Sequence, residues 1–429
     1  MTILISAVGN TDPISKNRDS ALMHITRKYK PERIILLYSE EMLVKKTLIE
    51  RALFSFKDYK PDVKIHEQIL RNDEVYLYDK MYEVIGKIIK EYSKLGEELI
   101  LNLSSGTPQI KSALFAINRI DDYNTKAIQV TTPSNSSNNP QKILSKEEED
   151  NLFKNNEDNQ DNYENRCIMD IAEKFNHSLV KRHLRSLIES YDYLAVEKIV
   201  IRRDSKGLLS NKQLARLRII LTDLVNVFKK QEVLSEIQKY PLSEVEKKAL
   251  NYFLMIEILN KRGQVADVLI KSKSLVEFIL EDRIKRNHPN LITYKNKLPK
   301  LNKEHQDFEK VIGYLDSDYK KAQNENEGKK EDFSPTTTLN LIIYTKILEY
   351  YKYSPELIKS LRVIISLNNE RNKVAHGLSE IDSKLVNSKK LQQTIDTLRF
   401  ILQDTFEIDD SYFFCYQALN NEMLDLLRQ

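Results

Sequence analysis

Short apolar runs alternate with amphipathic stretches over the first 132 residues of the chain. Five runs have the length and composition of buried strands: "ILISAV" (3–8), "RIILLYS" (33–39), "KIHEQIL" (64–70), "ELILNLS" (98–104) and "KAIQVTT" (126–132). Two stretches between them, 77–94 and 108–120, place apolar residues at helical spacing. This alternation predicts parallel strands joined by crossover helices, and hence a Rossmann-like α/β domain over residues 1–140.

The next segment, from 133 to about 166, is rich in Asn, Ser, Asp and Glu, so we expect a polar linker or loop over 141–165, with room for a short helix. After Arg166 the strand pattern disappears. Helical patterns follow at 167–201, 249–263, 265–286, 337–353 and 355–368. The region 166–429 is therefore predicted to be all-helical, with a polar surface loop at 320–335.

Composition limits the classes of function without selecting one. The length of 429 residues favours two domains, and a formal net charge of +4 gives no ground for inferring binding to a polyanion. The two cysteines, Cys167 and Cys415, lack metal-ligand spacing, which favours a reducing compartment and disfavours zinc or a disulfide framework. Without a secretion signal or an apolar run of about 18 residues, we expect a cytoplasmic protein with no membrane partner.

Two loops that follow predicted strands are candidates for a ligand site. "GNTDP" (9–13) follows the first strand, and "SSGTPQ" (104–109) follows the fourth. In open parallel sheets, ligands bind at the carboxyl ends of the strands, where the first amides of the next helix lack partners. Gly106, the small hydroxyl residues and Pro108 at the first helical position favour a phosphate or nucleotide there. The alternative is that these residues only cap the helix.

Absent motifs narrow the class of ligand further. Neither G-x-G-x-x-G after the first strand nor a P-loop motif is present, which disfavours a dinucleotide redox cofactor and P-loop triphosphate chemistry. A small nucleotide fits the remaining pocket, with Asn10 and Gln109 facing base or ribose edges. Asp12 would repel a phosphate, so we expect it to meet a hydroxyl or a base amine.

Near the C-terminus, "NNERNKVAHGLSEID" (368–382) contains Arg371, Asn372 and His376 within six residues. The spacing from arginine to histidine is weak evidence by itself. Two other pairs have a similar spacing: Arg18 with His24, and Arg283 with His288. We expect the first of these histidines to pack or face solvent, because it lies between the first predicted strand and its helix. We expect the second to be a polar helix terminus, because the helix runs out before Pro289.

Helix geometry raises the question of how Arg371 and His376 meet. Five residues turn about 500° on an ideal helix, which leaves these two about 140° apart, whereas Asn372 and His376 share a face. Either the arginine uses its length, or two copies of the motif combine across a symmetric dimer. The sequence does not decide whether this stretch ends a helix at Gly377, where the helix dipole favours a protonated histidine, or begins one.

These residue types support the cleavage of RNA without a metal ion. His376 can accept a proton from the ribose 2′-hydroxyl or give one to the leaving 5′-oxygen, while Arg371 neutralises the scissile phosphate. Asn372 would orient a partner or hold the phosphate. Such proton transfer typically contributes about 10² to 10⁴ in rate. The alternative is an exposed or core-capping histidine beside a solvated arginine.

Three stretches together resemble the CARF and HEPN ribonucleases of type III-A CRISPR systems, the Csm-associated effectors of streptococci and related bacteria. They are "LISAVGNTDP", "ILNLSSGTPQIKSALFAINRI" and "ERNKVAHGLSEID". The resemblance implies that a CARF domain binds a cyclic oligoadenylate made by the type III-A interference complex, and that the HEPN domains of a homodimer then cleave single-stranded RNA. It further implies a six-membered ring as the activator and slow cleavage of that ring within the CARF pocket.

Matched residue by residue, the resemblance assigns catalysis to Arg371, Asn372 and His376. It assigns activator binding to Gly9, Asn10, Thr11, Asp12, Ser39, Ser104, Ser105, Gly106, Thr107 and Gln109, and it implies no metal site. The CARF domain would occupy 1–140, connecting helices 166–240 and the HEPN domain 241–429. The expected reaction is metal-independent endonucleolytic cleavage in antiviral defence, leaving 2′,3′-cyclic phosphate and 5′-hydroxyl ends.

Two functions of other classes are compatible with the same residues. A non-catalytic nucleotide sensor would act through a partner or nucleic acid and would bind nucleotide without turning over RNA. A nucleotide-modifying enzyme would work at the N-terminal loops, so that its chemistry would depend on Asp12 or Thr107 and not on His376.

Overall fold

The computed structural model describes residues 2–94, 96–132, 145–201, 207–325, 333–377, 380 and 386–428, with the backbone alone described for 322–325 and 374–377. The chain forms two compact units, Met1–Asn176 and His177–Gln429. No helix within the described ranges is long and apolar enough to cross a membrane.

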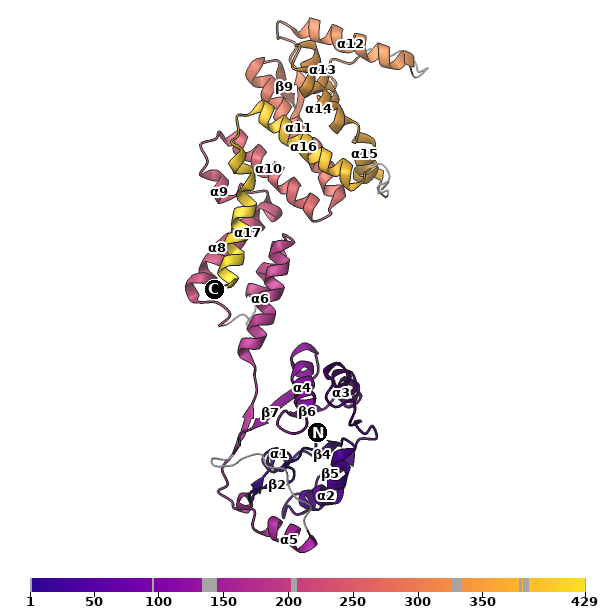
Figure 1. Cartoon of the computed structure of the whole chain (residues 1–429). Helices are drawn as coiled ribbons and strands as arrows, with labels where there is room; N and C mark the ends of the chain where they lie inside the picture. Colours follow the sequence, from indigo (N-terminus) through magenta and orange to yellow (C-terminus); the bar gives the residue numbers. More distant parts are fainter. Residues whose placement is uncertain are drawn as a thin grey trace. The chain divides into compact units, whose positions relative to one another are not determined.

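The first unit is built on a six-stranded sheet with the strand order β5-β4-β1-β6-β7-β8 (Figure 1). Five strands are parallel: β1 (Thr2–Ala7), β4 (Arg33–Leu37), β5 (Asp62–Ile65), β6 (Glu98–Asn102) and β7 (Thr125–Val130). The predicted parallel sheet is therefore confirmed. The third predicted strand is displaced, because pairing with β4 begins at Asp62 and the segment after Ile65 leaves the ladder.

Helices cover both faces of this sheet, which is why its central strands β1, β4 and β6 are largely apolar and buried. Successive residues of β1 point to opposite faces. Ile3 and Ile5 pack with α3 (Tyr78–Ser93) and α4 (Pro108–Ile120), whereas Leu4 packs with α1 (Ala21–Tyr29) and α2 (Lys46–Phe54). The carboxyl edge of the sheet is left for loops, the 3-10 helix η1 (Glu41–Lys45) and the hairpin of β2 (Ile14–Ser15) and β3 (Arg18–Asp19).

The segment expected as a linker packs onto the first unit wherever it is described. It forms α5 (Lys146–Lys154), which begins with a capping box of Ser145 and Glu148, and the 3-10 helix η2 (Glu157–Asn159). Asn156, Asp158 and Arg166 are buried, so this polar stretch is held by hydrogen bonds and ion pairs rather than by apolar packing. Residues 133–144 lie outside the described part of the chain.

The prediction of an all-helical region after Arg166 is wrong at two places. Residues Cys167–Met169 form β8, which pairs antiparallel with β7. Residues Ile292–Lys295 and Leu298–Leu301 form the hairpin β9–β10, whose turn residues Asn296 and Lys297 have φ of 54° and 64°. Strands of three or four residues are too short to show a period, and this hairpin turn contains no glycine, so neither carries a strong sequence signal.

The second unit is otherwise helical and has one large apolar core. Its helices are α7 (Tyr193–Ile201), α8 (Asn211–Lys230), α9 (Ser235–Gln238), α10 (Glu244–Lys261), α11 (Val265–Asn287), α12 (Phe308–Glu325), α13 (Leu341–Tyr350), α14 (Pro355–Ile365), α15 (Asn368–Gly377), α16 (Ser388–Thr405), η4 (Asp410–Phe414) and α17 (Cys415–Arg428). Helix α6 (Glu173–Glu189) spans the unit boundary. The predicted surface loop 320–335 is corrected in part, because α12 continues through Glu325. Residues 326–332 lie outside the described part of the chain.

Candidate functional site

A cavity of about 500 Å³ lies at the carboxyl ends of the parallel strands of the first unit. Both predicted loops line it, as does Ser39, two residues beyond the end of β4. Eight of the candidate residues are among its lining: Gly9, Asn10, Thr11, Ser39, Ser104, Ser105, Gly106 and Thr107. Its charged lining residues are Asp19, Glu41, Lys111 and Arg166. The position agrees with the rule that open parallel sheets bind ligands beyond the carboxyl ends of their strands.

Two glycines allow the loops to approach each other closely. Gly106 has φ of +95°, and a Cβ there would lie 2.9 Å from the Cβ of Ala7. A Cβ on Gly9 would lie 3.1 Å from the amide nitrogen of Gly106. Any side chain at Gly106 would therefore be strained and would collide with β1, so the shape of the cavity depends on glycine at this position.

Helix α4 begins as the sequence predicts, with Pro108 as its first residue. The Oγ1 of Thr107 caps it by accepting the Ile110 amide at 3.3 Å, and the same hydroxyl donates to the carbonyl of Val75 at 3.0 Å. Thr107 thus both caps the helix and lines the cavity, so helix capping and ligand binding are compatible functions of this loop. Gln109 lies in the first turn of α4 but is not among the residues that line the cavity.

Asp12 is buried beneath the cavity rather than facing it. Its Oδ2 accepts the Gly9 amide at 2.8 Å, and its Oδ1 accepts the hydroxyl of Ser20. Burial raises the pKa of the Asp12 carboxyl, and the bonds from Ser20, Gly9 and Ser105 oppose that rise. The hydroxyls that Asp12 meets therefore belong to the protein, and its part in the site is to shape the 9–13 loop.

Sequence reasoning missed Lys45, which supports the same loop. Its Nζ donates to the backbone oxygen of Asn10 at 2.5 Å and to that of Asp12 at 3.0 Å. Burial lowers the pKa of Lys45, and the charge of Asp12 opposes that change. No local motif marks this lysine, because its partners lie more than 30 residues earlier in the chain.

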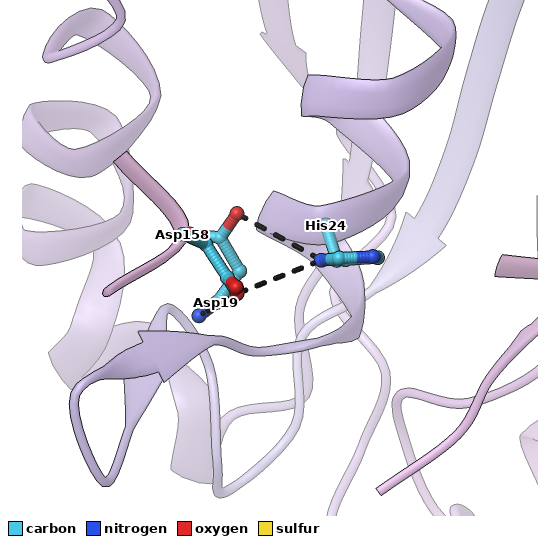
Figure 2. Close-up of side chains that lie close together, drawn as sticks. All are labelled: Asp19, His24 and Asp158. Atoms are coloured by element: carbon cyan, nitrogen blue, oxygen red, sulfur yellow. Dashed lines mark hydrogen bonds and ion pairs between the residues drawn. The ribbon is translucent and has the colours of Figure 1, made fainter. Parts of the chain in front are cut away.

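Beside the cavity lies a buried cluster of Asp19, His24 and Asp158, whose potential ligand atoms are within 4.8 Å of one another (Figure 2). The Nδ1 of His24 lies 3.6 Å from Asp158 and 4.0 Å from Asp19. Arg166 Nη2 occupies the position a cation would take, 2.9 Å from Asp158 Oδ2 and 3.1 Å from His24 Nδ1. Because Arg27 also pairs with Asp19, we interpret the cluster as a charge-balanced network.

In the second unit, Arg371, Asn372 and His376 all lie on α15. The helix is described from Asn368 to Gly377, and the two residues that follow lie outside the described part of the chain. Arg371 is partly exposed, and its Nη1 donates to the Oδ1 of Asn372 at 3.0 Å. The side chain of His376 lies outside the described part of the structure.

A second cavity, of about 620 Å³, adjoins this helix. It is lined by Ser366, Leu367, Asn369, Glu370, Asn372, Lys373 and Lys390. Glu370 is buried, and its carboxylate pairs with Lys373 at 2.6 Å. Asn372 thus accepts a hydrogen bond from Arg371 and also lines this polar cavity, to which Lys373 and Lys390 contribute.

Comparison with known proteins identifies the family. Over 427 residues the chain is 51% identical to the CRISPR system endoribonuclease Csm6 of Streptococcus thermophilus, with all of both chains covered. The chain belongs to the Csm6 family of CRISPR endoribonucleases. A second Streptococcus thermophilus relative, CRISPR system endoribonuclease Csm6′, is 37% identical, again over the full length of both. The protein is accordingly an endoribonuclease with CARF and HEPN domains.

Domain and structural comparisons agree with the Csm6 assignment. The family models for the Cas_Csm6 CARF domain and the Cas_Csm6 HEPN domain match residues 62–167 and 228–424. A solved structure of Enterococcus italicus Csm6 bound to cyclic hexa-2′-fluoro-hexa-dAMP superimposes with a TM-score of 0.69 at 26% identity, covering 99% of this chain and all of that one. The match to the CARF model includes the 104–109 loop, and the match to the HEPN model includes α15.

Within this Csm6 chain, the two other arginine and histidine pairs of similar spacing have structural roles. Arg18 pairs with Glu157 at 2.9 Å, and His24 is fully buried in the network beside the cavity. His288 caps the end of α11 and stacks on Tyr351, with ring centroids 3.6 Å apart. The expectations of a packed His24 and of a helix terminus at His288 are confirmed, whereas catalysis by Arg371 and His376 stays a prediction.

Proposed function

We propose that this endoribonuclease is switched on by a cyclic oligoadenylate that binds in the cavity of the first unit, and that it cleaves single-stranded RNA at α15. The observation that carries the proposal is the cavity itself. Its lining includes residues of the loops 9–13 and 104–109, both of which depend on glycine, and the N-terminus of α4. A helix N-terminus and backbone amides suit phosphates, and the polar side chains around them suit ribose and adenine edges.

The hexa-adenylate ring is the favoured activator. Enterococcus italicus Csm6, which shares the fold over nearly the whole chain, was solved with a cyclic hexanucleotide analogue. We assign binding to the eight candidate residues that line the cavity, which are seven residues of the two loops together with Ser39. Asp12 has an indirect role. We expect Gln109, in the first turn of α4, to contact the ring from outside the cavity. Slow cleavage of the ring in this cavity would end the signal.

Catalysis is assigned to Arg371, Asn372 and His376. The 2′-hydroxyl attacks the adjacent phosphorus, the P–O5′ bond breaks, and the proton lost by the 2′-oxygen is balanced by one given to the 5′-oxygen. This leaves a 2′,3′-cyclic phosphate and a 5′-hydroxyl. Arg371 neutralises the phosphate, and the bond from Arg371 to Asn372 holds the guanidinium toward the carboxyl end of α15. These groups supply the reaction without a metal ion.

A homodimer is the favoured state of the active enzyme. The helical course of α15 separates positions 371 and 376 by about 140°, so a composite site from two copies brings complementary residues together without a long reach. In the cell, the cytoplasmic dimer would be linked to the type III-A interference complex through the messenger alone.

The decisive experiment mixes the purified protein with a fluorescent single-stranded RNA in excess EDTA, with cyclic tetra-adenylate, cyclic hexa-adenylate or neither. We expect cleavage with the hexa-adenylate ring, and a loss of at least about 10² in rate for Arg371→Ala and His376→Ala. His183→Ala, an exposed histidine elsewhere on the second unit, serves as the matched control. Cleavage that needs a divalent metal, or that survives both substitutions in folded protein, would refute the mechanism.

A further inference from the structure

Arg166 joins two walls of the activator cavity through backbone oxygens. Its Nη1 donates to the carbonyl of Thr131 at 3.1 Å, just beyond β7, and its Nη2 donates to the carbonyl of Asp19 at 2.8 Å, at the end of β3. All three residues line the cavity. One guanidinium therefore spans from the loop after β7 to the β2–β3 hairpin.

The guanidinium is fixed by a buried counter-charge. Asp158 is 2% exposed and accepts from Arg166 Nη2 at 2.9 Å, and the same oxygen accepts the Asp19 amide at 2.8 Å. Asp158 thus touches both the arginine and the hairpin strand that the arginine holds. A buried ion pair with additional hydrogen bonds of this kind is costly to break from either side.

His24 fixes the backbone of the same residue. Its Nε2 accepts the Arg166 amide at 2.9 Å, and its Nδ1 lies 3.6 Å from Asp158. Arg27 neutralises Asp19 through two bonds of 2.6 Å and 3.1 Å. Two guanidinium groups, those of Arg27 and Arg166, therefore balance the two carboxylates that Figure 2 shows beside His24.

Building on the proposed function, we propose that Arg166 is a positioning residue for the cyclic oligoadenylate, a cross-brace that sets the distance between the hairpin wall and the β7 wall of the cavity. Its planar fork reaches two carbonyls and a carboxylate at once. A lysine ammonium is a single point donor on a flexible stem and cannot hold all three in the same geometry.

The test is a titration of the activator with the full-length protein. Arg166→Lys is expected to raise the concentration of cyclic hexa-adenylate for half-maximal RNA cleavage, and the Kd of the labelled ring, by about tenfold. The rate at saturating activator is expected to stay at the wild-type value, since α15 is untouched. Arg18→Lys is the matched control, because Arg18 pairs with Glu157 and Glu164 on the same segment and does not line the cavity.

A second variant keeps the test decisive if Arg166→Lys folds poorly. Asp158→Asn retains an acceptor for the guanidinium but removes its counter-charge, so it should shift the same midpoint in the same direction by a smaller factor. Two results would overturn the role of Arg166 while leaving the proposed function intact. One is a wild-type activator concentration for half-maximal cleavage in both variants, and the other is an unchanged concentration with a lower rate at saturating activator. Failure of the wild-type protein to bind the ring would overturn the proposed function as well.

Discussion

The ammonium group of Lys45 lies 2.5 Å from the backbone oxygen of Asn10 and 3.0 Å from that of Asp12, so that one side chain shapes the loop after β1. Replacing it by glutamine leaves at least one of these oxygens without its donor. We expect Lys45→Gln to destabilise the first unit by about 1–3 kcal/mol and to weaken ring binding. Isothermal titration with cyclic hexa-adenylate and hydrogen exchange of the 9–13 loop would measure both effects.

Lys46→Gln is the matched control for this substitution. Lys46 is exposed, is the first residue of α2 and does not line the cavity. Equal effects of the two substitutions would show that loss of a local positive charge, and not loss of the loop contacts, governs the response.

Gly106→Ala tests the close approach of the two loops. The positive φ of Gly106 and the 2.9 Å contact of its added Cβ with Ala7 force either the loop or β1 to move. Strain at such a position costs of order 1–3 kcal/mol. We expect activation by the ring to be lost or severely weakened, as measured by the activator titration. Unchanged activation by Gly106→Ala protein would show that the cavity tolerates a shift of this loop.

Gly86→Ala provides the contrast within the same unit. An added Cβ there lies 3.9 Å from Ile117, and the site is inside helix α3. This substitution should stabilise the unit by roughly 0.5–1 kcal/mol because alanine favours a helix over glycine. The thermal midpoint should therefore rise for Gly86→Ala and fall for Gly106→Ala.

Asp12 makes a prediction about pH. Burial raises the pKa of its carboxyl above the ordinary value of 3.8. The proton is thus held more tightly in the folded chain, and the associated stability is present below that ordinary value and is lost as the pH rises through the raised folded pKa. Asp12→Asn should therefore gain stability relative to the wild type as the pH increases, by up to about 1.4 kcal/mol per pH unit in that window.

Hydrogen exchange of β1 and α4 amides across a pH series would measure this difference locally in the first unit. The chain has no tryptophan, so intrinsic tryptophan fluorescence offers no readout. A loss of stability of Asp12→Asn relative to the wild type as the pH rises would contradict the assignment of a raised pKa.

Asn372→Ala separates catalysis from activation. The substitution removes the 3.0 Å contact with Arg371 while leaving the first unit unchanged. We expect the saturated cleavage rate to fall by about tenfold, in line with the loss of a hydrogen bond to a charged group, with the activator midpoint preserved. Asn369→Ala, an exposed residue of the same helix, should leave the rate near the wild-type value.

The strands β1, β4 and β6 were predictable because each is an apolar run that is covered on both faces and bounded by polar residues. The exposed and half-buried residues of β5 carry a weaker signal, and its predicted bounds were displaced. The position of the cavity followed from two loops at the ends of those strands. In contrast, β8 has three residues, and its identity depends on pairing Cys167 with Val130 across a long stretch of chain.

The supporting residues of the cavity were not predictable for the same reason. Lys45 reaches oxygens 33 and 35 residues away, and Arg166 reaches the carbonyl of Asp19 across 147 residues. Such contacts leave no period or motif in the sequence. Polar composition suggested a linker at 141–165, yet burying Asn156 and Asp158 required partners that only the folded unit provides.

The position of Arg166 in the chain also orders events during synthesis. The ribosome delivers a protein from its N-terminus, and domains tend to fold as units as they emerge. The five parallel strands and both glycine loops leave the ribosome first, while the residue that braces the cavity comes after all of them. If Arg166 acts as the proposed brace, a nascent chain completes the five parallel strands before the cavity is braced, and its full sensitivity to the proposed messenger is acquired only as β8 is added.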